Sequence, residues 1–128
     1  MMEKKILVVE DNVMNLELVS DLLEAHGYRV LQAQGGAEAI TLAQKEQPNL
    51  ILMDLQLPEM DGLEITRLLK RNPLTEGIIV VALTAHAMLG DEEKAREAGC
   101  SGYIAKPINT RGFADVIAGF LEGDTGRA

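Results

Sequence analysis

Polar side chains that could take part in chemistry follow four separate aliphatic runs of the sequence. Glu10 and Asp11 follow KILVV, Asp54 follows LILM, Thr84 follows GIIVVAL, and Lys106 follows GYIA. If these runs are strands of one parallel sheet, the residues that follow them meet at the edge where such sheets bind their ligands. The spacing therefore predicts a site that combines three carboxylates, a hydroxyl and an ammonium group.

The three carboxylates predict a divalent metal ion. Carboxylates that are forced together repel one another and raise one another's pKa unless they share a cation. All the candidate ligands are hard oxygens, and no histidine or cysteine lies at ligand spacing from them, so Mg²⁺ is favoured over zinc. The alternative is an acidic rim held together by ordinary salt links.

Asp54 is the candidate nucleophile. A carboxylate beside Mg²⁺ can accept a phosphoryl group and form an aspartyl phosphate. Mg²⁺ and Lys106 would then neutralise the charge of the transferred group, and Thr84 could donate a hydrogen bond to one of its oxygens. Each residue also has a simpler interpretation: Asp54 and Thr84 as turn residues at strand ends, and Lys106 as a solvated loop lysine.

The order of predicted elements supports a shared edge. Short aliphatic or β-branched segments predict strands over 5–9, 28–33, 50–53, 77–83 and 102–105. Helical patterns with cap and stop signals at Asn12, Gly27, Pro48 and Gly99 predict helices over 13–26, 35–47, 63–71, 91–99 and 110–122. This alternation without long linkers predicts an α/β fold, in which a parallel sheet is covered by helices on both faces.

Composition restricts the partners and the compartment. The 128 residues carry a formal net charge of −8 and only 3% aromatic residues, which argues against nucleic acid as a ligand. Cys100 is the only cysteine, so an intramolecular disulfide is impossible. No apolar run is long enough for a signal-peptide core or a membrane span. We expect one cytoplasmic domain over 1–122, without membrane insertion, and a disordered tail over 123–128.

The residues at the strand ends resemble the receiver domain of response regulators. The resemblance covers nearly the whole chain and rests on the acidic pair, the later aspartate and threonine, and a final Lys-Pro pair. It implies a doubly wound, flavodoxin-like sheet of five parallel strands in the order 2-1-3-4-5. It also implies that Asp54 is the phosphoacceptor, and that Asp11, Asp54 and the backbone carbonyl of Gln56 bind Mg²⁺, with Glu10 acting through water.

The resemblance assigns roles to further polar groups. Thr84 and Lys106 would bind the phosphoryl oxygens, and Tyr103 would turn inward as the Thr84 hydroxyl moves toward the phosphate. For Tyr103, ordinary packing against a neighbouring helix is the alternative. The peptide bond after Lys106 is expected to be cis. The side chain of Gln56, together with His86, would tune water access and the lifetime of the phosphoryl group.

The first predicted helix carries a candidate partner surface. A polar arc on one side of the helix consists of Glu17, Ser20, Asp21 and Glu24. Met14 and Leu18 lie at the edge of the apolar arc, which is wider than the stripe of about 100° that covers a core. The resemblance implies that Met14, Leu18, Pro107 and Ile108 form a docking patch for a histidine kinase or a histidine phosphotransfer protein. Simple core packing is the alternative.

Taken together, these features predict a single-domain response regulator of a two-component system or phosphorelay. Phosphorylation of Asp54 would change the affinity for a downstream protein partner, and similarity to a cell-division regulator of the family implies a role in cell-cycle control. Such a protein is not an enzyme in the usual sense, because it catalyses only its own phosphorylation and dephosphorylation. One alternative is a docking adapter that does not use phosphorylation. A haloacid-dehalogenase-type phosphatase is disfavoured because Gln56 stands where that family has a second acid.

Overall fold

A parallel sheet of five strands forms the centre of the computed structural model, which describes residues 3–85 and 91–122. His86 and the predicted tail over 123–128 lie outside these residues. In chain order the elements are β1 (Lys5–Val9), α1 (Val13–Ala25), β2 (Arg29–Ala33), α2 (Gly36–Glu46), β3 (Leu50–Asp54), α3 (Gly62–Arg71), β4 (Ile79–Thr84), α4 (Asp91–Ala98), β5 (Gly102–Ala105) and α5 (Phe113–Leu121). The strand order is β2-β1-β3-β4-β5, which confirms the predicted fold.

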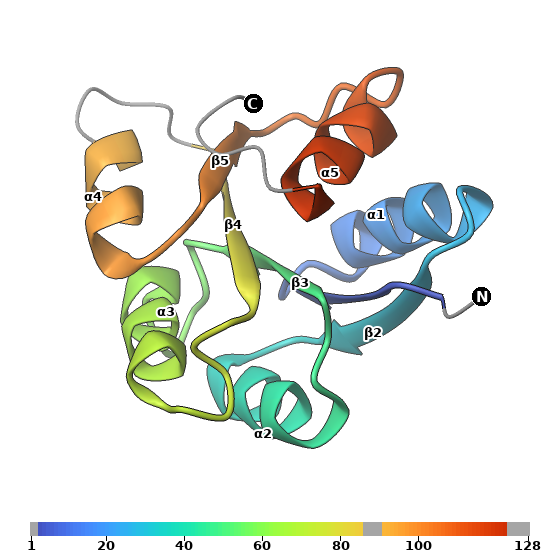
Figure 1. Cartoon of the computed structure of the whole chain (residues 1–128). Helices are drawn as coiled ribbons and strands as arrows, with labels where there is room; N and C mark the ends of the chain where they lie inside the picture. The colour runs from blue at the N-terminus through green and yellow to red at the C-terminus, as the bar shows by residue number, and fades with distance from the viewer. Residues whose placement is uncertain (1–2, 86–90, 123–128) are drawn as a thin grey trace.

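Helices cover both faces of the sheet, which explains why its central strands are apolar over most of their length. Helices α1 and α5 lie on one face, and α2, α3 and α4 lie on the other (Figure 1). Along β1, Ile6 and Val8 pack toward α1 and α5, whereas Leu7 and Val9 pack toward α2 and α3. Because successive side chains of a strand point to opposite faces, a strand between two helical layers needs apolar residues at every position.

Two predicted element starts differ from the structure by more than one residue. Strand β4 begins at Ile79 rather than at residue 77, because the ammonium group of Lys70 donates hydrogen bonds to the carbonyls of Glu76 and Ile78 and holds this segment in a turn. Helix α5 begins at Phe113 rather than at residue 110. Its first turn lacks a side-chain cap, since Gly112 occupies the N-cap position.

Ser20, which lies in the polar arc predicted for α1, is buried against β2. Its side chain is buried, donates a hydrogen bond to the carbonyl of Leu16 at 2.6 Å and accepts one from the amide of Gln32 at 2.8 Å. These two bonds satisfy the hydroxyl inside the interface between α1 and β2. No helix in the described part of the chain is long and apolar enough to cross a membrane.

Gly62 allows α3 to begin directly against the end of β3. A Cβ atom at this position would overlap the carbonyl oxygen of Asp54 and the Cα atom of Leu55. Asp61 caps the helix, because its side chain accepts a hydrogen bond from the backbone N–H of Leu63 at 2.9 Å. The close approach thus fixes the loop that follows Asp54.

We expect Gly62→Ala to lower the free energy of unfolding by about 2 kcal/mol, because the added methyl group overpacks a backbone contact. Urea denaturation would measure this loss. Gly77→Ala is the matched control, since a Cβ atom there meets nothing within 4 Å, and we expect a change below about 0.5 kcal/mol. Equal stability of the two variants would show that the loop after β3 relaxes at little cost.

Candidate functional site

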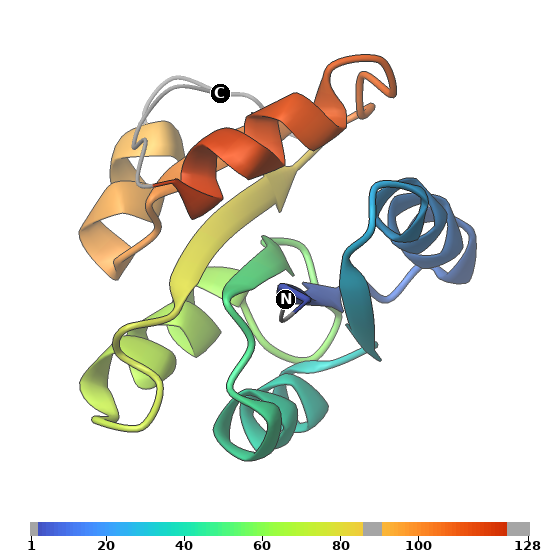
Figure 2. The same ribbon diagram turned by 45° about the vertical axis from the view of Figure 1, so that its right-hand side comes forward.

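The residues that follow β1 and β5 are held at one edge of the sheet by backbone hydrogen bonds. The N–H of Glu10 donates to the carbonyl of Ala33 at 3.0 Å, and the N–H of Lys106 donates to the carbonyl of Thr84 at 2.7 Å. Asp54 is itself the last residue of β3 and pairs with Leu83 of β4. The site residues are therefore mounted on the sheet, which restricts their backbone motion. Figure 2 shows the same layers from a second direction.

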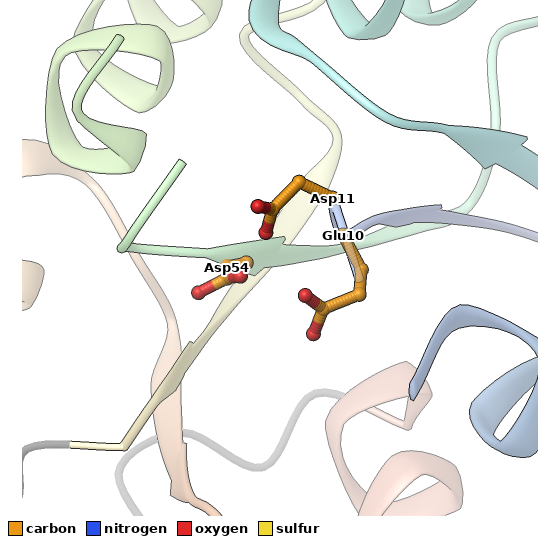
Figure 3. A group of neighbouring side chains, drawn as sticks. All are labelled: Glu10, Asp11 and Asp54. Atoms are coloured by element: carbon orange, nitrogen blue, oxygen red, sulfur yellow. The ribbon is translucent and has the colours of Figure 1, made fainter. Parts of the chain in front are cut away.

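The three predicted carboxylates do come together. Glu10, Asp11 and Asp54 each offer an oxygen that lies within 4.8 Å of the others, and their side chains converge in Figure 3. Asp54 is only 1% exposed and Glu10 is equally buried, whereas Asp11 is exposed. This set of hard oxygen donors, open to solvent on one side, fits a hydrated Mg²⁺ ion.

Lys106 is the cation closest to the buried carboxylates in the part of the chain that the structure describes. Its Nζ atom lies 2.7 Å from Oε1 of Glu10 and 3.3 Å from Oδ2 of Asp54. The other oxygen of Asp54 accepts a hydrogen bond from the backbone N–H of Gln56 at 2.9 Å. Asp54 is thus held from two sides, and its two oxygens have different partners.

The charges at the site shift two pKa values. Burial raises the pKa of Glu10, and the nearby negative charge of Asp54 raises it further. The hydrogen bond from Lys106 lowers this pKa, but it does not cancel the other two effects. Burial alone would lower the pKa of Lys106, but its hydrogen bond to Glu10 and the charge of Asp54 outweigh burial and raise it. Lys106 therefore stays charged, whereas keeping Glu10 ionised costs free energy.

Thr84 and Tyr103 lie in different surroundings. Thr84 is buried at the end of β4, where it pairs with Ala105 of β5. Tyr103 is half-buried and lines a separate groove between β5, α4 and α5, together with Glu92 and Val116. The peptide bond between Lys106 and Pro107 is cis, as predicted. The inward rotation of Tyr103 stays a prediction.

Three of the four residues of the predicted partner patch line a groove. Leu18, Pro107 and Ile108 line this groove together with Glu10 and Lys106, so the patch borders the carboxylate site. Leu18 is 45% exposed, which agrees with its predicted place at the edge of the apolar arc. Met14 is 80% exposed, but it is not among the residues that line the groove.

The sequence analysis missed Asn15, which also lines this groove. Its position one helical turn before Leu18 was the available signal, since residues three apart lie on the same side of a helix. Helix α1 therefore contributes one polar side chain, Asn15, to this groove, beside the apolar side chains of Leu18 and Val19.

Comparison with known proteins identifies the family. The response regulator receiver domain matches residues 6–118. The chain belongs to this family. Receiver domains typically bind Mg²⁺, and the family is one of signalling switches rather than conventional enzymes. The predicted family is thus confirmed.

Individual relatives agree with this assignment. The receiver is 48% identical to the polar-differentiation response regulator DivK of Brucella anthropi over 120 residues, which cover 94% of this chain and 98% of that protein. A CheY-like receiver from Methanospirillum hungatei has a TM-score of 0.88 at 31% identity and covers 96% of this chain and 97% of that chain. The chemotaxis response regulator CheY4 of Vibrio cholerae has a TM-score of 0.86 at 26% identity over 91% of this chain and 98% of that chain. The similarity to DivK therefore extends over most of the chain.

We expect Lys106→Met to lower the free energy of unfolding by about 3 kcal/mol at pH 7, because it leaves buried carboxylates without their cation. The loss should be smaller at pH 5. Without the lysine the already raised pKa of Glu10 rises further. A raised carboxyl pKa lowers stability only at pH values above the pKa that the same carboxyl has in the unfolded chain.

Urea denaturation of the wild type and of Lys106→Met at both pH values measures this difference. Lys94→Met is the control, since Lys94 is exposed on α4 and its removal should have the same small effect at pH 5 and pH 7. A loss for Lys106→Met that does not change with pH would contradict the role assigned to Glu10.

Proposed function

We propose that this protein is a phosphorylation-dependent switch of a two-component system or phosphorelay, with Asp54 as the phosphoacceptor. The observation that carries the proposal is the placement of Asp54. Its carboxylate is 1% exposed, lies 3.3 Å from Lys106 and shares a cluster with two further carboxylates. A nucleophile held rigidly beside fixed positive charge is the arrangement that phosphoryl transfer requires.

The proposed reaction moves a phosphoryl group from a phosphohistidine to Asp54. An oxygen of Asp54 forms a bond to phosphorus while the bond between phosphorus and the donor nitrogen breaks, and the histidine leaves as a neutral imidazole after it takes up a proton. The N–H of Gln56 holds Oδ1 of Asp54 and so orients the carboxylate. Lys106 and the Thr84 hydroxyl are proposed to bind the phosphoryl oxygens, which carry the charge in the transition state.

Asp11, Asp54 and the backbone carbonyl of Gln56 are the residues that we propose would hold Mg²⁺. When bound, Mg²⁺ supplies positive charge that offsets the charge of the phosphoryl group. Asp11 is exposed, which suits an ion that keeps several of its water ligands. The chain is proposed to catalyse no reaction beyond its own phosphorylation and dephosphorylation.

Phosphorylation is proposed to alter binding of a protein partner in the cytoplasm. Movement of the Thr84 hydroxyl toward the phosphoryl group would free space into which Tyr103 turns, and this changes the groove of β5 that Tyr103 lines. DivK of Brucella anthropi is named a polar-differentiation response regulator, which supports a role in cell-cycle control. The alternative of an adapter that ignores phosphorylation has less support, because all the predicted site groups lie at one edge of the sheet.

We propose that the protein that donates the phosphoryl group docks in the groove beside Glu10 and Lys106. Leu18, Pro107 and Ile108 offer apolar surface there, and Lys106 lies in the same groove. A histidine kinase or phosphotransfer protein that covers this surface would bring its phosphohistidine close to Asp54. Met14 would contribute at the margin, where it is exposed.

Incubation with acetyl phosphate should add one phosphoryl group to the wild type, and this addition should require Mg²⁺. Asp54→Ala should remove it, because the nucleophile is lost. Intact-mass spectrometry with and without Mg²⁺ measures both results. Absence of any addition would favour the phosphorylation-independent adapter, whereas steady release of phosphate from unrelated esters would favour a phosphatase.

Leu18→Asp should slow phosphoryl transfer from a histidine kinase at least about tenfold, because one buried apolar contact is replaced by a charge. Phosphorylation by acetyl phosphate should stay unchanged, since a small donor needs no docking surface. The assay uses a purified histidine kinase that phosphorylates the wild type. Leu68→Asp is the control, because Leu68 is a similarly exposed leucine on α3. Equal transfer rates for the two variants would contradict the docking proposal.

A further inference from the structure

We infer that Thr66 on α3 is a positioning residue for phosphoryl transfer to Asp54. The inference rests on the proposed function, since it assigns a role within the same reaction. Thr66 belongs neither to the carboxylate cluster nor to the residues that line the groove beside it. It acts through Gly62 on the loop of residues 55–61, in which the backbone N–H of Gln56 donates a hydrogen bond to Oδ1 of Asp54 at 2.9 Å.

The loop that carries Gln56 is fixed at both of its ends. At its start, the N–H of Leu55 donates to the carbonyl of Leu83 in β4 at 2.9 Å. At its end, the N–H of Gly62 donates to the carbonyl of Leu55 at 3.4 Å. Gly62 also lies so close to the backbone of Asp54 that no side chain fits between them. The placement of Gly62 therefore sets the placement of Gln56.

The glycine at the start of α3 needs a further contact to hold it. The close approach to Asp54 requires glycine at position 62, but glycine has more backbone freedom to lose on folding than any other residue. The hydroxyl of Thr66 restricts this freedom, because it donates a hydrogen bond to the carbonyl of Gly62 at 2.8 Å. Thr66 thus fixes the residue against which the loop ends.

The Thr66 hydroxyl has defined partners in the core. Thr66 is 0% exposed, and the thiol of Cys100 donates to its Oγ1 atom at 4.0 Å. Burial raises the pKa of this thiol to about 11, so the thiol keeps its proton and remains a donor at neutral pH. Because a buried hydroxyl costs free energy unless it is hydrogen-bonded, packing alone does not require one here. The bond to Gly62 gives the hydroxyl a purpose.

The test compares Thr66→Val, which keeps the packing and loses the hydroxyl, with Thr66→Ser, which keeps the hydroxyl and loses a methyl group. The first readout is amide hydrogen exchange, measured by NMR without phosphodonor or Mg²⁺. Thr66→Val should raise the exchange rate of the Gln56 N–H about fivefold, the scale of one neutral hydrogen bond. Thr66→Ser should leave this rate unchanged, because local opening does not depend on global stability.

Thr75 supplies a matched control at the other end of α3. It is also 0% exposed, and its hydroxyl donates to a backbone carbonyl of α3 at 2.6 Å. Close to it, the N–H of Leu74 donates to Oδ1 of Asn72 at 2.9 Å, which is the same local arrangement as the bond of Gln56. Thr75→Val should speed exchange at Leu74 and not at Gln56, and Thr66→Val should do the reverse.

The second readout is the rate of phosphorylation by acetyl phosphate, followed by intact mass over a range of Mg²⁺ concentrations. Thr66→Val should raise the Mg²⁺ concentration for half-maximal rate about fivefold, because the carbonyl of Gln56 is a proposed ligand of the ion. Thr66→Ser should respond to Mg²⁺ as the wild type does, although the loss of a buried methyl group lowers its urea midpoint. This pair separates positioning from a general loss of stability.

Equal exchange rates of the Gln56 N–H in Thr66→Val and Thr75→Val would overturn the inference. A response to Mg²⁺ in Thr66→Val that matches the wild type would overturn it as well. A wild type that accepts no phosphoryl group would instead overturn the proposed function. The exchange rates would still show in that case whether Thr66 fixes the loop.

Discussion

The ion pairs of Lys106 are the interactions on which the site depends. Two carboxylates, those of Glu10 and Asp54, are buried at one edge of the sheet, and Lys106 lies within 3.3 Å of an oxygen of each. Buried carboxylates that lie close together repel each other. The lysine offsets this repulsion before any metal ion or phosphoryl group arrives. Its raised pKa shows that the pairing outweighs the cost of burying the ammonium group.

The parallel sheet supplies the rigidity that this charge arrangement needs. Asp54 ends a strand that is buried along its whole length, and Gly62 lets α3 begin against the backbone of Asp54. A carboxylate on a flexible loop would turn toward solvent to escape its neighbours. At the tip of an apolar strand, Asp54 has little freedom to do so. The aliphatic run in front of Asp54 would thus serve the proposed chemistry, because it keeps the Asp54 carboxylate in place.

Much of the fold and of the site could be predicted from the sequence, because the signals were local. Aliphatic runs with acids at their ends place Glu10, Asp11 and Asp54 correctly, since the carboxyl ends of parallel strands share one edge. Two of the errors concern contacts with residues outside the element itself. The start of β4 depends on Lys70 binding backbone carbonyls, and the burial of Ser20 depends on Gln32. Neither partner can be read from the periodicity of the element concerned.

The pairing of Glu10 with Lys106 shows the same limit within the site. The two residues are 96 positions apart, so the sequence brought the carboxylates together but did not reveal which one holds the lysine. The structure also places both residues in the wall of the groove that contains Leu18 and Ile108. A donor bound there would cover Lys106 and exclude water around it, and this strengthens every charge interaction with the phosphoryl group. The proposed docking and the proposed chemistry would therefore be coupled, because Lys106 belongs to both surfaces.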